Sequence, residues 1–286
     1  MYSRILIAYD GSDSAPHVLE QALILARSEQ AALDIVTVIP RYQGNLRLLG
    51  NTGVLEAMAD QYRNALDNAR DAARAGGVRA RVHLREGEAD DEVPDLAEEL
   101  GADLVVIGKR ARFLLDHMPI GLTAIAIFKN SPVDVLVVAG NKALHLDRLF
   151  LACQPSAAGG PAADRAASIA ARYASSLTIG IAYDPGLKAF ALASHFEEAM
   201  QRQAKEEALK AAGIAEAAGV RHVKTVIKRG DPWYKTLGEE ATAAGAGLII
   251  SGLDSEHGLS RLLPGAGTGR LVGFSPCPVL IAKKAS

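Results

Sequence analysis

The feature that most restricts the fold of this chain is an internal repeat with a spacing of 144 residues. The segment GADLVVIG ends at Gly108 and the matching segment GAGLIISG ends at Gly252. SRILIAYDGS and DRLFLACQPS, and NSPVDVLVVA and FSPCPVLIAK, keep the same order and spacing. A repeat this long predicts two globular domains in tandem, because the units of solenoid proteins have only about 20–50 residues. We predict one domain over residues 1–140 and a second over residues 145–286.

Within each copy, strand patterns alternate with helix patterns. In the first copy, RILIAY, ALDIVTVI, VRARVHLREG, DLVVI and VDVLVVA have the short apolar or alternating composition of strands. HVLEQALILAR, the segment from Val54 to the glycine pair at 76–77, and Val93 to Leu100 have apolar residues at helical spacing. The second copy repeats this order, with a long helix predicted over residues 193–218. The alternation predicts an α/β fold of two doubly wound, five-stranded parallel-sheet domains, Rossmann-like and nucleotide-binding α-hydrolase-like.

Composition argues against several classes of protein. The chain has 49% apolar residues, 22% charged residues and a net charge of −2, so we expect a globular protein that binds neither nucleic acid nor membranes. No apolar run approaches the ~18 residues of a membrane helix, and the N-terminal run is too short for a signal peptide. We therefore expect a cytoplasmic protein. Cys153 and Cys277 form no CxxC motif, and we expect both to be core residues.

The sequence also lacks the common enzyme motifs. GxSxG, HExxH and GxxxxGK[ST] are all absent, so we predict that the protein is not an enzyme. His117 lies in one candidate loop, and Glu256 and His257 lie in another; a metal-binding or proton-shuttling role is the alternative to exposed or packing side chains, which are favoured. Asp254, Glu256 and His257 are too close together in sequence to predict a metal site. Trp233 stands at a predicted helix start, where packing is the favoured role and lining a pocket the alternative.

Two features of the first copy follow predicted strands at their carboxyl ends, where doubly wound sheets bind ligands. Asp10 suits a ribose hydroxyl or an adenine amino group; alternatively Asp10, Ser12 and Ser14 are helix N-cap candidates. Gly108 allows the backbone to approach a ligand closely, and basic residues follow it. The backbone N–H groups from Gly121 to Thr123 would open a helix and attract an anion. The alternative for this loop is a solvated basic turn.

The motifs of the whole chain resemble those of the universal stress protein family, in its tandem two-domain form. RILIAYDGSDSA, DIVTVIP, EGEADDEVPDLAEELGADLVVIGKR and NSPVDVLVV carry the resemblance in the first copy. KRGDP, AGAGLIISG, GLSRLLPG and SPCPVLIA carry it in the second. In the nucleotide-binding branch of that family, an Asp after the first strand contacts the nucleoside. A loop of Gly, two residues, Gly, nine residues, Gly and then Ser or Thr holds the phosphates.

Neither copy has the full set that the resemblance implies. The first copy has Ala111 where the second glycine is expected. It has Leu122 where Ser or Thr is expected, and Thr123 comes one position late. Its loop also has Leu114 where the second copy has Gly258. In the second copy, Ser255 replaces the second glycine, Ala266 replaces the Ser or Thr, and Gln154 replaces the Asp after the first strand. Gly267 and Thr268 offer a shifted phosphate cradle. The candidate cofactor-binding residues are Asp10, Val38, Gly108, Lys109, Arg110, Gly121, Thr123, Gly252, Gly258, Gly265 and Thr268.

These departures support two functional hypotheses. The favoured one is a cytoplasmic, non-enzymatic stress-response protein that binds a small ligand in a partly degenerate nucleotide-type pocket and acts through protein partners. The alternative is a switch that binds ATP or AMP, with Mg²⁺, mainly in the first domain and has slow or no ATPase activity. A third interpretation is a scaffold whose pockets are filled by side chains. No cofactor other than such a nucleotide is expected.

The predicted fifth strands, VDVLVVA and PVLIAK, are sheet edges that need a partner. The family resemblance implies that such strands pair between subunits. In a tandem chain, this predicts an intrachain pseudo-dimer, with a homodimer of whole chains as a further option.

Overall fold

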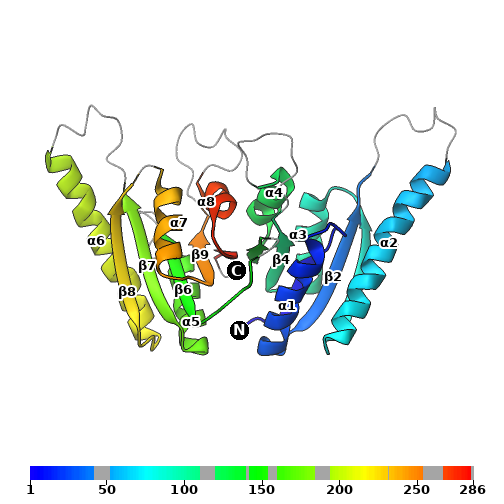
Figure 1. The fold of residues 1–286 in the computed structure, drawn as a ribbon, viewed down its shortest axis with the longest axis horizontal. Helices are drawn as coiled ribbons and strands as arrows, with labels where there is room; N and C mark the ends of the chain where they lie inside the picture. Colours follow the sequence, from blue (N-terminus) through cyan, green and yellow to red (C-terminus); the bar gives the residue numbers. More distant parts are fainter. Residues whose placement is uncertain are drawn as a thin grey trace. The chain divides into compact units, whose positions relative to one another are not determined.

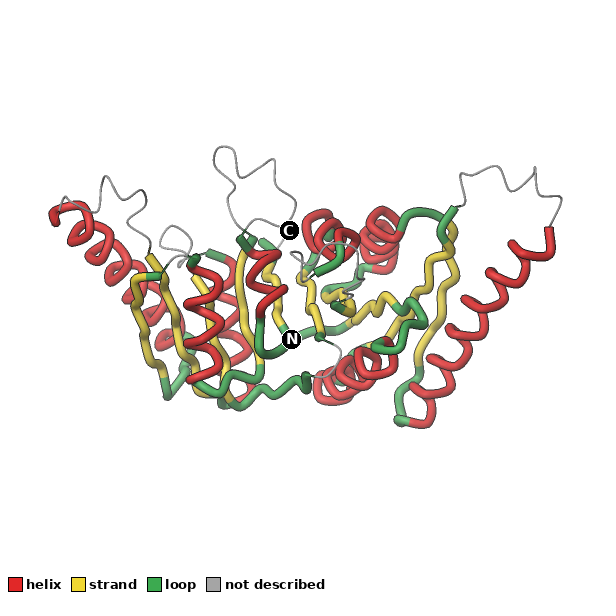
Figure 2. Tube along the Cα trace, turned by 45° about the horizontal axis from the view of Figure 1, so that its top comes forward, coloured by secondary structure: helices red, strands yellow, loops and turns green. Residues whose placement is uncertain are grey.

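The structure is a computed structural model, which describes residues 1–41, 52–109, 120–139, 142–153, 160–183, 194–230, 232–253 and 267–284. The chain divides into two compact units (Figure 1). The first unit contains every element from β1 to β5, and the second contains every element from β6 to β10. Figure 2 shows that both units combine helices with strands.

The first unit is a five-stranded parallel sheet with the strand order β3-β2-β1-β4-β5. The order reverses after β1, so right-handed connections place α1 and α2 on one face and α3 and α4 on the other. Helices α3 and α4 accordingly pack against each other. The elements are β1 Arg4–Ala8, α1 Ala15–Glu29, β2 Ala32–Ile39, α2 Thr52–Ala75, β3 Ala80–Glu86, α3 Ala89–Leu100, β4 Leu104–Gly108, α4 Leu122–Asn130 and β5 Asp134–Val138.

The second unit repeats this topology, with its strands in the order β8-β7-β6-β9-β10. The long helix predicted in this copy is α6. The predicted α/β class with two doubly wound parallel sheets is therefore confirmed, while the pseudo-dimer stays a prediction. The elements are β6 Arg148–Cys153, α5 Pro161–Tyr173, β7 Ser176–Tyr183, α6 Ser194–Ala217, β8 Val223–Arg229, α7 Trp233–Ala243, β9 Leu248–Gly252, α8 Thr268–Phe274 and β10 Val279–Ala282.

Helix α3 begins one turn earlier than its apolar pattern predicts. The pattern starts at Val93, but the helix starts at Ala89 with an acidic first turn. Acidic side chains stabilise a helix N-terminus through the helix dipole, so this turn needs no apolar residue of its own. Pro94 lies in the second turn and removes one backbone hydrogen bond, which the buried apolar face of the helix tolerates.

The central strands form the core of each sheet. Ile5, Leu6 and Ile7 of β1 have no exposed surface, because helices cover both faces of a doubly wound sheet. In β6, Phe150 is also fully buried, and its ring fills the space beside Gly180 of β7. A Cβ atom at position 180 would overlap that ring. The glycine is therefore needed for packing.

We expect Gly180→Ala to lower the free energy of unfolding by about 1–3 kcal/mol, because it overpacks the core against Phe150. The matched control is Gly213→Ala, in α6, where an added Cβ has no neighbour within 4 Å. That change should stabilise the protein by about 0.5–1 kcal/mol through helix propensity. Urea unfolding measures both, and equal effects at the two glycines would contradict the packing argument.

Candidate functional site

The strand pairing of the first unit brings Asp10 and Gly108 to the same edge of the sheet. β1 pairs in parallel with β4 from Ile5 opposite Leu104 to Ile7 opposite Val106. Asp10 follows β1, and Gly108 is the last residue of β4. This is the carboxyl edge at the position where the strand order reverses, the usual ligand site of a doubly wound sheet.

Asp10 lies in a turn that is fixed by β2. The Tyr9 N–H donates to the carbonyl of Val36 at 2.8 Å, and the hydroxyl of Thr37 donates to the carbonyl of Tyr9 at 2.7 Å. Beyond Asp10, the N–H of Ser12 donates to Asp10 Oδ1 at 2.9 Å. The Asp10 side chain is exposed, so its carboxylate is presented to solvent from a backbone held on both sides.

Asp10 is not the N-cap of α1. The cap is Ser14, which makes no side-chain capping hydrogen bond, and the helix begins at Ala15. Of the three N-cap candidates, Ser14 is confirmed as the cap position, whereas Asp10 and Ser12 precede it, because Pro16 fits the first turn of a helix and sets a later start. The Asp10 carboxylate instead closes the preceding turn.

Gly108 and Lys109 lie at the end of β4. A Cβ atom at Gly108 would be 3.2 Å from Val18 Cγ2, so the glycine allows α1 to pack closely against this strand end. The N–H of Lys109 donates to the carbonyl of Val138 at 2.8 Å, which fixes its backbone to the end of β5. Burial lowers the pKa of the Lys109 ammonium group. A bound anion would offset that lost hydration.

Helix α4 is the element that follows β4 along the chain, and Gly121 is its N-cap. Because Gly121 has no side chain to cap the helix and the first turn contains no acidic residue, the N-terminus of α4 is electrostatically suited to an anion. Thr123 is exposed in this first turn, and Leu122 is 58% exposed. Val38, at the carboxyl end of β2, is half-buried.

The second unit differs at the corresponding positions. Thr268, the first residue of α8, is buried, and its hydroxyl donates to the carbonyl of Gly252 at 3.1 Å. Gly267 caps this helix with φ 68°, a backbone conformation that favours glycine. A Cβ atom at Gly252 would meet nothing closer than Ala162 Cβ at 3.8 Å. The Thr268 hydroxyl therefore binds the protein's own strand end, and Gly252 is not required by packing.

Several predicted site residues lie outside the described residues. They include the candidates Arg110, Gly258 and Gly265. The loop departures and loop histidines lie outside them too: Ala111, Leu114, His117, Gln154, Asp254, Ser255, Glu256, His257 and Ala266.

Two residues of the first site were missed by sequence reasoning. Gly11 has φ 67°, and a Cβ atom there would lie 2.9 Å from Ala65 Cβ of α2. The Asp-Gly dipeptide is a turn signal that could have indicated this residue. Thr37 is buried, and its hydroxyl holds Tyr9. A single threonine in an apolar strand carries no such signal, because threonine is common in strands.

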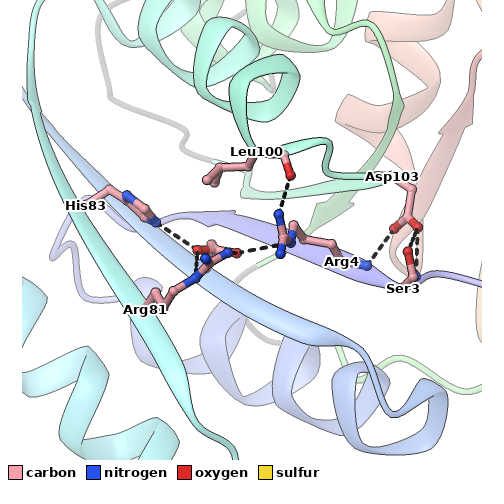
Figure 3. Close-up of polar contacts among 7 residues, drawn as sticks. Ser3, Arg4, Arg81, His83, Leu100 and Asp103 are labelled. Atoms are coloured by element: carbon pink, nitrogen blue, oxygen red, sulfur yellow. Dashed lines mark hydrogen bonds and ion pairs between the residues drawn. The ribbon is translucent and has the colours of Figure 1, made fainter.

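A second polar cluster lies within the sheet of the first unit. Asp34 of β2 is buried and receives two bonds from Arg81, Nε to Oδ1 at 2.9 Å and Nη2 to Oδ2 at 2.9 Å. His83 Nε2 lies 2.8 Å from Asp34 Oδ1, and Arg4 Nε lies 3.8 Å from Oδ2. Figure 3 shows Arg4, Arg81 and His83 converging on one carboxylate. Burial raises the pKa of Asp34, but hydrogen bonds and charges from Arg81 and His83 outweigh it and hold the pKa below its usual value.

The Asp34 cluster is structural and is absent from the second unit. Asp34 pairs in register with Arg81, and the corresponding pair in the second sheet is Thr178 and Lys224. Arg4 also donates to the carbonyl of Leu100 at the end of α3 (Figure 3). The cluster therefore ties β1, β2, β3 and α3 together on one face of the first sheet.

The remaining candidates are packing residues. Cys153 and Cys277 are buried, as predicted, and burial raises the pKa of their thiols to about 12 and about 11. Trp233 meets Tyr234 edge to face with ring centroids 6.2 Å apart, and Tyr234 stacks on Phe274 at 5.5 Å.

Across the described ranges, no group of three or more His, Cys, Asp and Glu side chains is placed to hold a metal ion. No helix in the same ranges is long and apolar enough to cross a membrane.

The two units both match one known family. The family model described as the Universal stress protein family matches residues 1–139 and again residues 147–283. The chain belongs to the universal stress protein family. It carries two universal stress domains, in agreement with the 144-residue repeat, and the boundaries 1–140 and 145–286 stay predictions.

Similar proteins match either the whole chain or about half of it. Universal stress protein Rv2319c of Mycobacterium tuberculosis is 27% identical over 300 residues, covering 97% of this chain and 98% of that protein. Universal stress protein YxiE of Bacillus subtilis is 32% identical over 147 residues, covering 48% of this chain and 99% of its own. The crystal structure of a universal stress protein from Archaeoglobus fulgidus has a TM-score of 0.70 at 18% identity, covering 99% of this chain and 97% of that one. The last likeness shows that the universal stress fold extends over both units.

Proposed function

We propose that this universal stress protein is a non-enzymatic stress-response protein that binds a small nucleotide-type ligand, ATP or AMP, in its first unit. The observation that carries the proposal is the placement of the exposed Asp10 carboxylate and the Gly108 strand end at one carboxyl edge of the sheet. This edge combines an acceptor for a nucleoside with backbone and cationic groups for phosphate.

Each candidate residue has a distinct role in the proposed complex. The Asp10 carboxylate accepts hydrogen bonds from ribose hydroxyls or an adenine amino group, and Val38 offers an apolar surface to the base. Lys109 and the N-terminus of α4 attract phosphate oxygens, with Gly121 leaving the first N–H groups of the helix uncapped by a side chain. Mg²⁺ would arrive with the phosphates of ATP, which commonly supply many of its ligands.

We further propose that the second unit does not bind the same ligand. Thr268, the candidate for a shifted phosphate cradle, donates its hydroxyl to the carbonyl of Gly252. The acidic residue is also missing, because Gln154 stands where the first copy has Asp10. Losing a charge-assisted contact of about 1.5–3 kcal/mol lowers affinity about 10- to 100-fold. The second unit then serves the fold of the tandem rather than nucleotide recognition.

Isothermal titration of the full chain with AMP, and with ATP and Mg²⁺, tests the proposed ligand class. We expect saturable heat and an increase in the melting temperature with at least one of these nucleotides. The absence of both at about 1 mM nucleotide would overturn the proposal. Measuring phosphate release from ATP in the same samples separates the switch hypothesis, because sustained turnover would contradict a non-enzymatic role.

A further inference from the structure

The loop after β1 rests against the side of α2. Gly11 has φ 67°, and a Cβ atom at this position would lie 2.9 Å from Ala65 Cβ. The backbone of Gly11 therefore approaches α2 more closely than a residue with a side chain could. Ala65 is half-buried and adjoins Leu66, which is 5% exposed and belongs to the inner face of α2.

This contact lies directly beside the carboxylate that we propose as the nucleoside acceptor. Gly11 joins Asp10 to Ser12, and the Ser12 N–H to Asp10 Oδ1 bond of 2.9 Å spans the glycine. On the strand side, Tyr9 is already fixed by Val36 and Thr37 of β2. Helix α2 thus supports the same short turn from the other side.

We propose that Ala65 is a positioning residue, whose small side chain lets α2 hold the Gly11 turn so that Asp10 faces the ligand site. The statement about the ligand rests on the proposed function, but the statement about the turn does not. Helix α2 contacts both β2 and β3. These contacts fix α2 on the sheet, and Ala65 then sets how closely the Gly11 turn approaches the helix. A larger side chain at Ala65 would therefore shift this turn, and Asp10 with it, relative to the strand ends.

The second unit supports this assignment by contrast. The buried residues of α2, Leu66, Ala69 and Ala73, correspond at a constant spacing of 142 to Ala208, Ala211 and Ala215 of α6. The same spacing places Glu207 at the position of Ala65. The Glu207 side chain is 17% exposed and pairs with Lys210 at 2.6 Å. It lies close enough to Cys153, the end of β6, to contribute to the raised pKa of that thiol.

A carboxylate at this helix position is compatible with the second unit, where Gln154 follows the first strand of the copy. In the first unit it would stand beside a turn that already carries Asp10, and two neighbouring carboxylates repel each other. Ala65 therefore suits the unit in which Asp10 follows the first strand, and Glu207 suits the unit in which Gln154 stands at that position.

A double-mutant cycle between Gly11 and Ala65 tests the contact without any ligand. Gly11→Ala should speed hydrogen exchange of the Ser12 amide at least about tenfold, because the added Cβ pushes the turn away from α2. Ala65→Gly removes the opposing Cβ, so the double variant should recover the part of the Ser12 protection that is lost to the contact, while the strain of a side chain at φ 67° remains. Exchange as fast in the double variant as in Gly11→Ala would overturn the positioning role. Global stability is measured in parallel by urea unfolding, so that a general loss of structure is recognised.

Nucleotide affinity provides the second readout. Ala65→Glu, which transfers the residue of the second unit, should weaken AMP or ATP binding at least about tenfold. The control Asn68→Glu adds the same charge at an exposed position of α2 and should change affinity less than about twofold. Equal affinities in the two variants would overturn the inference. If the wild-type chain binds no nucleotide, the proposed function fails, and the Ser12 exchange measurement still decides whether Ala65 positions the turn.

Discussion

Replacing Asp10 by alanine is expected to weaken nucleotide binding about 10- to 100-fold, because it removes a charge-assisted hydrogen bond of about 1.5–3 kcal/mol. Asp10 is exposed at the end of β1, so its removal should change the free energy of unfolding by less than about 1 kcal/mol. Isothermal titration with the nucleotide that binds the wild-type chain measures the loss.

Two control variants separate the charge of Asp10 from its role in the turn. Asp10→Asn keeps a side-chain oxygen that can accept the Ser12 N–H, so it should preserve the turn and still lose affinity. Asp13→Ala removes an exposed carboxylate from the same loop and should leave affinity unchanged. Equal losses in Asp10→Ala and Asp13→Ala would show a general charge effect and contradict a specific contact.

Replacing Asp34 by alanine is expected to lower the free energy of unfolding by about 2–4 kcal/mol. Removing one member of a buried ion pair leaves its partners uncompensated, which commonly costs about 3–5 kcal/mol. We expect somewhat less here because the Arg81 side chain is 56% exposed and can recover water. Glu99→Ala, which breaks the exposed ion pair with Arg85, is the control and should cost at most about 1 kcal/mol. If Asp34→Ala lowered the free energy of unfolding by no more than Glu99→Ala does, the structural role of the cluster would be contradicted.

The stability provided by Asp34 should depend on pH. Its pKa is lowered in the folded protein, so the carboxylate binds protons more weakly there than in the unfolded chain. This contribution is fully present above the unfolded pKa of about 3.9 and is lost as the pH falls through the lower, folded value. The difference in unfolding free energy between wild type and Asp34→Asn should therefore shrink below about pH 4. A difference that does not change between pH 7 and acid would contradict this linkage.

The sequence predicts those parts of the fold that depend on local pattern. The apolar runs at β1 and β4 are buried on both faces, so they are recognisable without knowledge of their neighbours. The 144-residue repeat then predicts the second sheet from the first. The first turn of α3 was missed because it is stabilised by Asp90, Asp91 and Glu92, and a search for apolar spacing does not detect them.

The contacts that shape the site are harder to predict, because they join residues far apart in the chain. The pattern of alternating strands and helices places Asp10 and Gly108 at one edge of the sheet. It does not show that Thr37 holds Tyr9, or that Ala65 meets Gly11. Single residues of common types make these contacts, so no motif marks them. The N-cap prediction at Asp10 was wrong for a related reason, since local sequence cannot tell a cap from a turn that precedes it.

The number of nucleotides bound per chain decides whether the first unit alone holds the ligand. Native mass spectrometry of the full chain, titrated with AMP or with ATP and Mg²⁺, measures this number together with the mass of the assembly. We expect one nucleotide per chain, bound about 10- to 100-fold more weakly in Asp10→Ala and with unchanged affinity in Gln154→Ala. Two nucleotides per chain, or one whose affinity is unchanged in Asp10→Ala, would contradict the assignment of the ligand to the first unit.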